Sequence, residues 1–200
     1  MTTFYKPYRG KNYKEGGLLL MSESAYCWPN DETGSMECPR RDHPTGTVKY
    51  WAWKHFEDRG KEAKYAAWLT RAQCQTISPR LDEREAAWNE VSYSIFVQRP
   101  MASLKHRPTP EDLVSSGEAF LKIIELLSPG RVVITSITCW NEMPNTVAHP
   151  LNEARKQPYR LADGVVSWCL AVPHQRARRM GWERLGECIH EFRNEHLPGR

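Results

Sequence analysis

Four short apolar runs, separated by intervals long enough for helices, constrain the fold of this chain most strongly. They cover residues 18–21, 91–97, 131–135 and 165–172. Runs of this length are typical of buried strands and are too short for buried helices. Strands that alternate with helices indicate a parallel sheet covered on both faces. The sequence therefore predicts an α/β fold with three layers, α/β/α, around a central four-stranded parallel sheet, in one domain over residues 1–200.

The intervals carry helical patterns of their own. Thr109 is suited to cap a helix that starts at Pro110, and Pro129-Gly130 is suited to end it. Helical content is also expected in residues 46–73 and 82–90, where tryptophans should anchor the core. A C-terminal helical stripe is formed by Met180, Leu185, Ile189 and Phe192.

Composition places the chain among ordinary globular proteins. It is 40% hydrophobic and 26% charged, with 28 basic and 24 acidic residues and a net charge of +4. No run approaches the about 18 to 20 apolar residues of a membrane span, and residues 1–17 do not form a signal peptide. We expect a cytoplasmic monomer that does not bind membranes.

The six cysteines give no sign of a metal site. Cys27, Cys38 and His43 lie in one loop-like stretch, but no CxxC or HxxxH spacing supports ligation. An iron–sulfur cluster would need a CxxC pattern that the chain lacks. We expect free thiols, no metal and no cofactor.

Basic residues gather in two places. Lys6, Arg9, Lys11 and Lys14 alternate with aromatic residues near the N-terminus, and Arg176, Arg178 and Arg179 follow the last predicted strand. Basic residues among aromatic ones suit phosphate and base contacts. A solvated charged face is an equally reasonable interpretation of either cluster.

Two residues at predicted strand ends have the chemistry of a hydrolase. Ligands of parallel sheets bind at the carboxyl ends of the strands, and there the chain places Glu23 and His174. In cleavage of an N-glycosidic bond, a carboxylate stabilises the sugar cation and orients water, while an imidazole stabilises the departing base. Taken singly, a Glu or a His at such a position is more often structural than catalytic.

Several segments resemble, in order, the uracil-DNA glycosylase-like superfamily. The segment from Tyr8 to Tyr13, followed by residues 18–26, resembles a PYxGxNY-type lead and a strand ending in GES; other members have GEAPG or GQDPYH there. Residues 94–100 resemble a strand of the form NVVxxRP, residues 130–136 with Trp140 resemble the third strand, and residues 172–174 resemble a strand ending in HPS. The similarity covers most of the chain.

The resemblance implies a DNA glycosylase that flips a nucleotide into its site. Glu23 matches the acidic position of GEAPG, and His174 matches the histidine that stabilises the leaving base. The base pocket would be formed by Ser22, Ser24, Tyr26 and Ser94. The DNA contacts would be made by Ser136, Thr138, Arg176, Arg178, Arg179 and Met180, with Arg178 or Met180 as the wedge inserted into the duplex.

Departures from the family pattern leave the substrate open. Ser94 replaces the asparagine that reads uracil, Gln175 replaces the proline of HPS, and residues 28–49 form a polar insertion. These changes favour a modified or non-canonical pyrimidine, such as a hypermodified cytosine of foreign or phage DNA, in repair or anti-phage defence. The alternatives are a plain uracil-DNA glycosylase, an inactive DNA-binding protein of the same fold, and an α/β hydrolase acting on free nucleosides.

Overall fold

The centre of the molecule is a mixed sheet of six strands in the order β1-β3-β2-β4-β6-β5. The computed structural model describes residues 5–25, 48, 64–99, 101, 107–144, 155–162, 164–175 and 180–197. The strands are β1 (Tyr8–Arg9), β2 (Leu18–Ser22), β3 (Val91–Ile95), β4 (Arg131–Ile134), β5 (Lys156–Arg160) and β6 (Val166–Ala171).

The predicted fold class is correct at the level of α/β, but the sheet is larger than predicted. The four apolar runs form β2, β3, β4 and β6, and each adjacent pair among them is parallel. The prediction of a purely parallel four-stranded sheet is wrong, because β1 and β5 add antiparallel edges. Both edge strands lack an apolar run: β1 has two residues, and β5 contains two basic residues and Pro158. Charge and proline are typical of edge strands.

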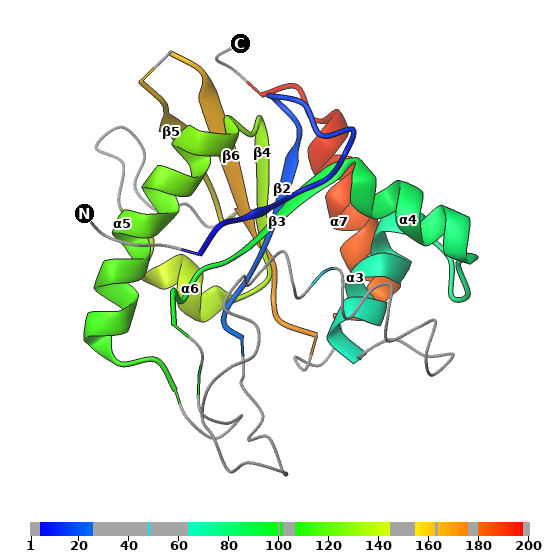
Figure 1. Cartoon of the computed structure of the whole chain (residues 1–200), viewed down its shortest axis with the longest axis horizontal. Coiled ribbons are helices and arrows are strands. Elements are labelled where there is room, and N and C mark those ends of the chain that lie inside the picture. The colour runs from blue at the N-terminus through cyan, green and yellow to red at the C-terminus, as the bar shows by residue number, and fades with distance from the viewer. Residues whose placement is uncertain are drawn as a thin grey trace.

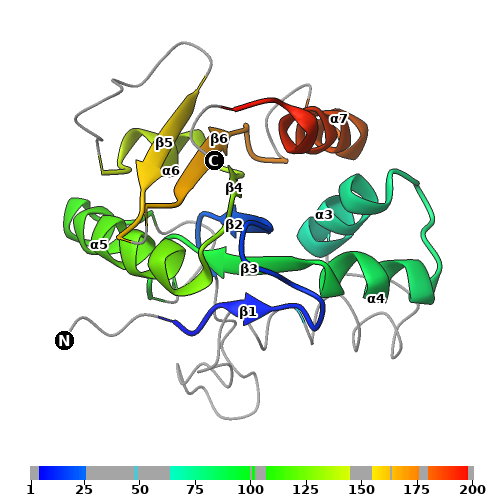
Figure 2. The same cartoon turned by 90° about the horizontal axis from the view of Figure 1, so that it is seen from above.

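Helices cover both faces of the sheet (Figure 1 and Figure 2). One face carries α5 (Pro110–Leu127) and α6 (Ile137–Asn141), and the other carries α3 (Lys64–Cys74), α4 (Leu81–Asn89) and α7 (Trp182–Asn194). Side chains alternate along β2, so that Leu18 and Leu20 lie in one core while Leu19 and Met21 lie in the other.

The predicted helix at residue 110 is confirmed, with its ends. The Thr109 hydroxyl accepts a hydrogen bond from the Asp112 N–H, and the Asp112 carboxylate accepts one from the Thr109 N–H. At the other end Ser128 takes a left-handed conformation, with φ at 42°, and its N–H bonds the Ile124 carbonyl. The helix therefore begins after the predicted cap, Thr109, and ends just before the predicted stop at Pro129-Gly130.

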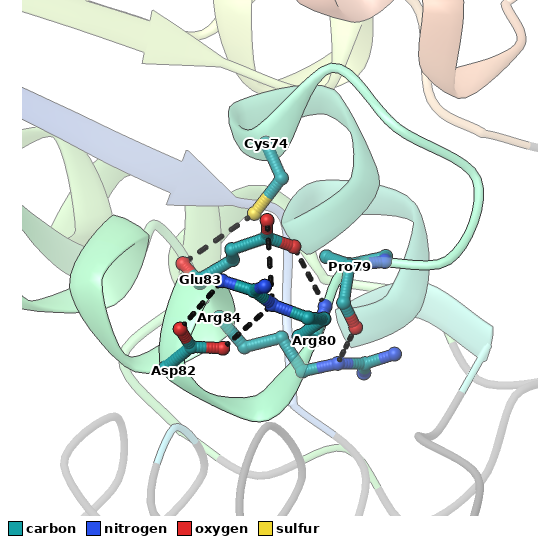
Figure 3. A network of polar contacts seen from close by, with 6 residues as sticks. All are labelled: Cys74, Pro79, Arg80, Asp82, Glu83 and Arg84. Carbon is teal, nitrogen blue, oxygen red and sulfur yellow. Dashed lines mark hydrogen bonds and ion pairs between the residues drawn. The ribbon is translucent and has the colours of Figure 1, made fainter.

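The turn between α3 and α4 is fixed by a local polar network (Figure 3). A carboxylate oxygen of Glu83 accepts a hydrogen bond from the Arg80 N–H at 2.8 Å, which caps α4. Arg84 donates from Nε to the Pro79 carbonyl at 2.7 Å.

Trp68 and Trp88 are buried on this side of the sheet, as predicted for core anchors.

The N-terminal lead has a structural role that the sequence analysis did not predict. Tyr8 and Tyr13 are buried in the two cores, so their rings are not available to nucleic-acid bases. A Cβ on Gly10 would lie 2.2 Å from the Asn89 carbonyl oxygen, which explains the glycine. Because β1 runs antiparallel to β3, Lys11 and Lys14 lie toward the amino ends of the parallel strands.

The described helices include none that could cross a membrane, because none of them combines the required length with sufficient apolar character.

Candidate functional site

The candidate site lies where the order of the parallel strands changes direction. Along the chain, β2 is followed by β3 on one side, and the next parallel strand, β4, pairs with the other side of β2. The loops that leave the carboxyl ends of β2 and β4 therefore diverge. In open α/β sheets this switch point is where ligands bind.

Glu23 is fixed at this switch point. It follows β2 directly, and its Oε2 accepts a hydrogen bond of 2.7 Å from Oγ of Ser136, two residues after β4. Ser136 also caps α6, since its Oγ accepts from the Cys139 N–H at 3.3 Å. The single hydroxyl proton of Ser136 is therefore directed at Glu23.

A guanidinium faces the other oxygen of the same carboxylate. Nη1 of Arg107 lies 3.7 Å from Oε1 of Glu23. The Arg107 side chain is 77% exposed and the Glu23 side chain only 15%, so a sheltered anion lies beside a cation that solvent reaches. Arg107 lies just before α5 and was not predicted as a site residue.

Cys139 is a buried thiol close to this carboxylate, and it is inert. Burial raises the pKa of Cys139 far above its usual range, and the negative charge of Glu23 raises it further. A thiol held neutral at physiological pH is not a nucleophile. Among the residues described at this edge, Cys139 is therefore not the nucleophile.

His174 lies at the same edge of the sheet, three residues after β6. Its ring stacks on Tyr65 of α3, with ring centroids 5.6 Å apart and planes 11° apart. Trp68, one turn further along α3, contacts the imidazole at 6.5 Å and 38°. His174 is half-buried between these rings and the edge of the sheet.

A chain of contacts connects the two predicted catalytic residues through the end of β4. The Tyr65 hydroxyl lies 2.6 Å from Oγ1 of Thr135, the neighbour of Ser136. Glu23 is thus bound to Ser136, while His174 stacks on the ring that is bound to Thr135. Both side chains lie at the carboxyl edge, and their convergence on one pocket stays a prediction.

The predicted base-pocket residues take different positions. The Ser22 hydroxyl is buried and lies 2.6 Å from the Tyr93 hydroxyl. Ser94 is fully buried within β3, and Oγ of Ser94 and of Ser24 have no hydrogen-bond partner in the part of the chain that the structure describes. Ser94 pairs with Met21, so it lies inside the sheet before the strand ends. Tyr26 lies outside the described residues.

The predicted DNA contacts divide similarly. Ser136 is a partner of Glu23, and Thr138 is exposed in the first turn of α6. Met180 is buried in the core, and its carbonyl accepts from Nε1 of Trp68 at 3.2 Å, so in this structure its side chain cannot act as a wedge. The arginines at 176, 178 and 179 lie outside the described residues.

Arg107, Thr135, Tyr65 and Trp68 are the site residues that the sequence analysis missed. Thr135 and Ser136 directly follow a buried strand, which is a signal for a polar edge. Nothing in the sequence connects Tyr65 with His174, because they are 109 positions apart and only the fold brings α3 beside the segment that follows β6.

Comparison of the sequence with models of known families and with curated proteins finds no match. Among the residues that the structure describes, no group of three or more His, Cys, Asp or Glu side chains is placed to hold a metal ion.

Proposed function

We propose that this protein is a DNA glycosylase of the uracil-DNA glycosylase-like superfamily, which hydrolyses the N-glycosidic bond of a flipped-out, modified or non-canonical pyrimidine. One observation carries the proposal. The Glu23 carboxylate is held by Ser136 at the strand-order switch, on the sheet edge to which His174 also belongs. A fixed anion and an imidazole are the two groups that this hydrolysis needs.

Glu23 acts on the sugar and on water. As the bond between C1′ and the base nitrogen breaks, positive charge develops on the sugar, and the nearby carboxylate stabilises it. The same carboxylate orients the attacking water and accepts its proton as oxygen bonds to C1′. The Ser136 hydrogen bond restricts the carboxylate to one orientation before the substrate arrives.

His174 acts on the departing base. The base leaves with the electron pair of the broken bond, and a hydrogen bond from the imidazole stabilises the negative charge that it gains. Stacking against Tyr65 limits the directions in which the ring nitrogens can point. Glu23 and His174 then act on opposite sides of the same bond.

Arg107 is suited to bind the DNA backbone. Its exposed guanidinium at the rim of the site can contact a phosphate of the flipped nucleotide, and phosphate contacts position a nucleic acid without reading its sequence. A phosphate would compete with Glu23 for the guanidinium, because the 3.7 Å ion pair is exposed to water on the arginine side.

The substrate proposal rests on the residues that differ from the family pattern. Ser94 replaces the uracil-reading asparagine, and its hydroxyl is buried inside the sheet. A pocket without that amide loses the paired donor and acceptor that select uracil. We therefore propose a substituted pyrimidine, such as a hypermodified cytosine of phage DNA, as the released base.

Mass spectrometry of bases released from uracil-containing, unmodified and hypermodified DNA tests this function. The wild-type protein should release a modified pyrimidine, and Glu23→Gln and His174→Ala should each lower the rate by about 100- to 10,000-fold. Glu118→Gln and His190→Ala, two exposed positions on α5 and α7, are the matched controls and should keep the wild-type rate.

Each other outcome identifies an alternative. Release of uracil alone indicates a plain uracil-DNA glycosylase. DNA binding without release of any base indicates a binding protein of this fold. Release from free nucleosides, with no salt-dependent affinity for DNA, indicates a small-molecule hydrolase.

A further inference from the structure

Tyr65 connects the edge of the sheet with the imidazole of His174. Its ring lies nearly parallel to the imidazole, and its hydroxyl is 2.6 Å from Oγ1 of Thr135. We propose that Tyr65 is a positioning residue that holds the His174 ring in one orientation at the carboxyl edge of the sheet. The effect on base release rests on the proposed function, whereas the effect on ring orientation does not.

Hydrogen bonding fixes the Tyr65 hydroxyl and determines which group donates. Oγ1 of Thr135 donates to the Met21 carbonyl at 3.1 Å, and a backbone carbonyl can only accept. Thr135 has one hydroxyl proton, so the Tyr65 hydroxyl must donate to Thr135. Tyr65 is thereby bound to the end of β4, which is itself bound to β2.

Two further hydroxyls pair beside Met21 in the sheet. The Tyr93 hydroxyl of β3 lies 2.6 Å from Oγ of Ser22, the last residue of β2. Networks in which every member is satisfied rigidify their surroundings. The Tyr65 hydroxyl is therefore held at the end of β4 and, through Thr135, at β2.

The Tyr65 hydroxyl stays protonated at physiological pH. Burial raises the pKa of Tyr65 well above its usual value, with a further increase from Tyr93. The hydroxyl therefore keeps the proton that it donates to Thr135 at neutral pH. The anchor is permanent, which is what a positioning role requires.

Trp68 limits movement of the imidazole on a second side. Its ring is tilted by 38° to His174 and by 42° to Tyr65, so the three rings form a corner. Trp68 is itself held, because its side chain is 7% exposed and its Nε1 bonds the Met180 carbonyl. The imidazole thus lies against two rings that are each fixed by other contacts.

NMR of the histidine rings in the full-length protein tests the positioning directly. The His174 signals, assigned by their loss in His174→Ala, should show the ring-current displacement of a stacked ring. Tyr65→Leu should abolish that displacement, and Tyr65→Phe, which keeps the ring but loses its hydrogen bond to Thr135, should reduce it. Thr135→Val removes the same hydrogen bond but keeps the Tyr65 and His174 side chains, and it should also shift the His174 signals. Tyr159→Phe removes the hydroxyl of a buried tyrosine in the opposite core and should change nothing at His174.

Kinetics then tests whether positioning matters for catalysis. Tyr65→Leu should lower the single-turnover rate of base release by about 100-fold, the size expected for a misplaced catalytic group. In a His174→Ala background the same substitution should cause no further fall, since Tyr65 acts through His174. A further 100-fold fall in rate in the His174→Ala background would show that Tyr65 acts independently of His174, and it would overturn the claim that Tyr65 affects base release by positioning His174.

The two proposals fail separately. Unchanged His174 signals in folded Tyr65→Leu protein would overturn the positioning role, whatever the activity. Absence of base release from any DNA would overturn the proposed function and leave the NMR result to decide the orientation of the ring. Circular dichroism of each variant establishes that it is folded. If Tyr65→Leu is not folded, unchanged His174 signals in both Tyr65→Phe and Thr135→Val, which remove the anchoring hydrogen bond, would overturn the positioning role.

Discussion

Oγ of Ser136 lies 2.7 Å from Oε2 of Glu23, although 113 positions separate the two residues in the sequence. The contact joins the loop after β2 to the loop after β4 at the strand-order switch. The resemblance implied that Ser136 contacts a DNA phosphate. The structure gives it a different partner, a carboxylate that it orients.

Replacing Ser136 by alanine should separate orientation from folding. The loss of one hydrogen bond to a charged group, worth about 1.5 to 3 kcal/mol, should lower the rate of base release by about 10- to 100-fold. The loss of the α6 cap should also cost about 0.5 to 2 kcal/mol of stability. Single-turnover rates and chemical denaturation measure the two effects.

Glu83→Ala is the matched control for Ser136→Ala. It removes a cap of similar type from α4, at the turn shown in Figure 3, and should lower stability without changing the rate. Equal rate losses in both variants would mean that Ser136 acts only through helix stability.

The sequence predicts the parallel strands at the centre of the sheet because buried strands are rich in apolar residues. Residues 18–21 and 132–134 are apolar without interruption, and residues 91–97 are apolar apart from two small serines, since both faces of these strands are covered by helices. The edge strands β1 and β5 each pair with a single strand and carry charged residues. Their hydrophobic pattern is therefore no different from that of a loop.

The site is predictable only where its residues follow strands. Glu23 and His174 can be found because the carboxyl ends of parallel strands share one edge. Two other site residues, Arg107 before α5 and Tyr65 in the first turn of α3, do not follow strands. They reach Glu23 and His174 only because distant elements pack together, and such packing leaves no pattern in the local sequence. Met180 illustrates the converse error, because a residue near a motif position was assigned to DNA and lies in the core.

Arg107→Gln should weaken DNA binding by removing one phosphate contact. The slope of log K against log salt should become shallower by about one unit, because one counterion fewer is released. Lys14→Gln, at the amino end of β2, is the control and should leave the slope unchanged. An unchanged slope for Arg107→Gln would place the backbone contact elsewhere.

Asp112 should make folding stability depend on acidic pH. Its hydrogen bonds from Arg99, and then those of the Thr109 cap, lower the pKa of Asp112 to about 2. In the unfolded chain an aspartate has a pKa of about 3.9, so between these values the unfolded state binds more protons and stability rises with pH.

The size of this effect is limited by the exposure of Arg99, whose side chain is 48% exposed. We expect Asp112 to contribute about 1 kcal/mol at neutral pH, lost as the pH falls from about 4 toward 2. Urea unfolding of wild type and Asp112→Asn across this range measures the difference. Parallel stability curves for the two proteins would contradict the prediction.

Arg131→Met should destabilise the protein without affecting the site. Arg131 begins β4 at the edge opposite the site, and it donates from Nε to the Phe192 carbonyl and from Nη2 to the Glu195 carbonyl. Leaving those carbonyls of the α7 end without their donor should cost about 1 to 3 kcal/mol. Arg160→Met, at an exposed position, should change stability by no more than about 0.5 kcal/mol, and both variants should release base at the wild-type rate.

The catalytic role of Glu23 is decided by the single-turnover rate of base release by Glu23→Gln, measured beside the affinity of this variant for the same DNA. Glutamine keeps the size of the side chain and its bond to Ser136 but removes the charge and the proton acceptor. We predict a rate lower by at least about 100-fold with DNA affinity unchanged or higher. A Glu23→Gln protein that releases the base at the wild-type rate would contradict the account.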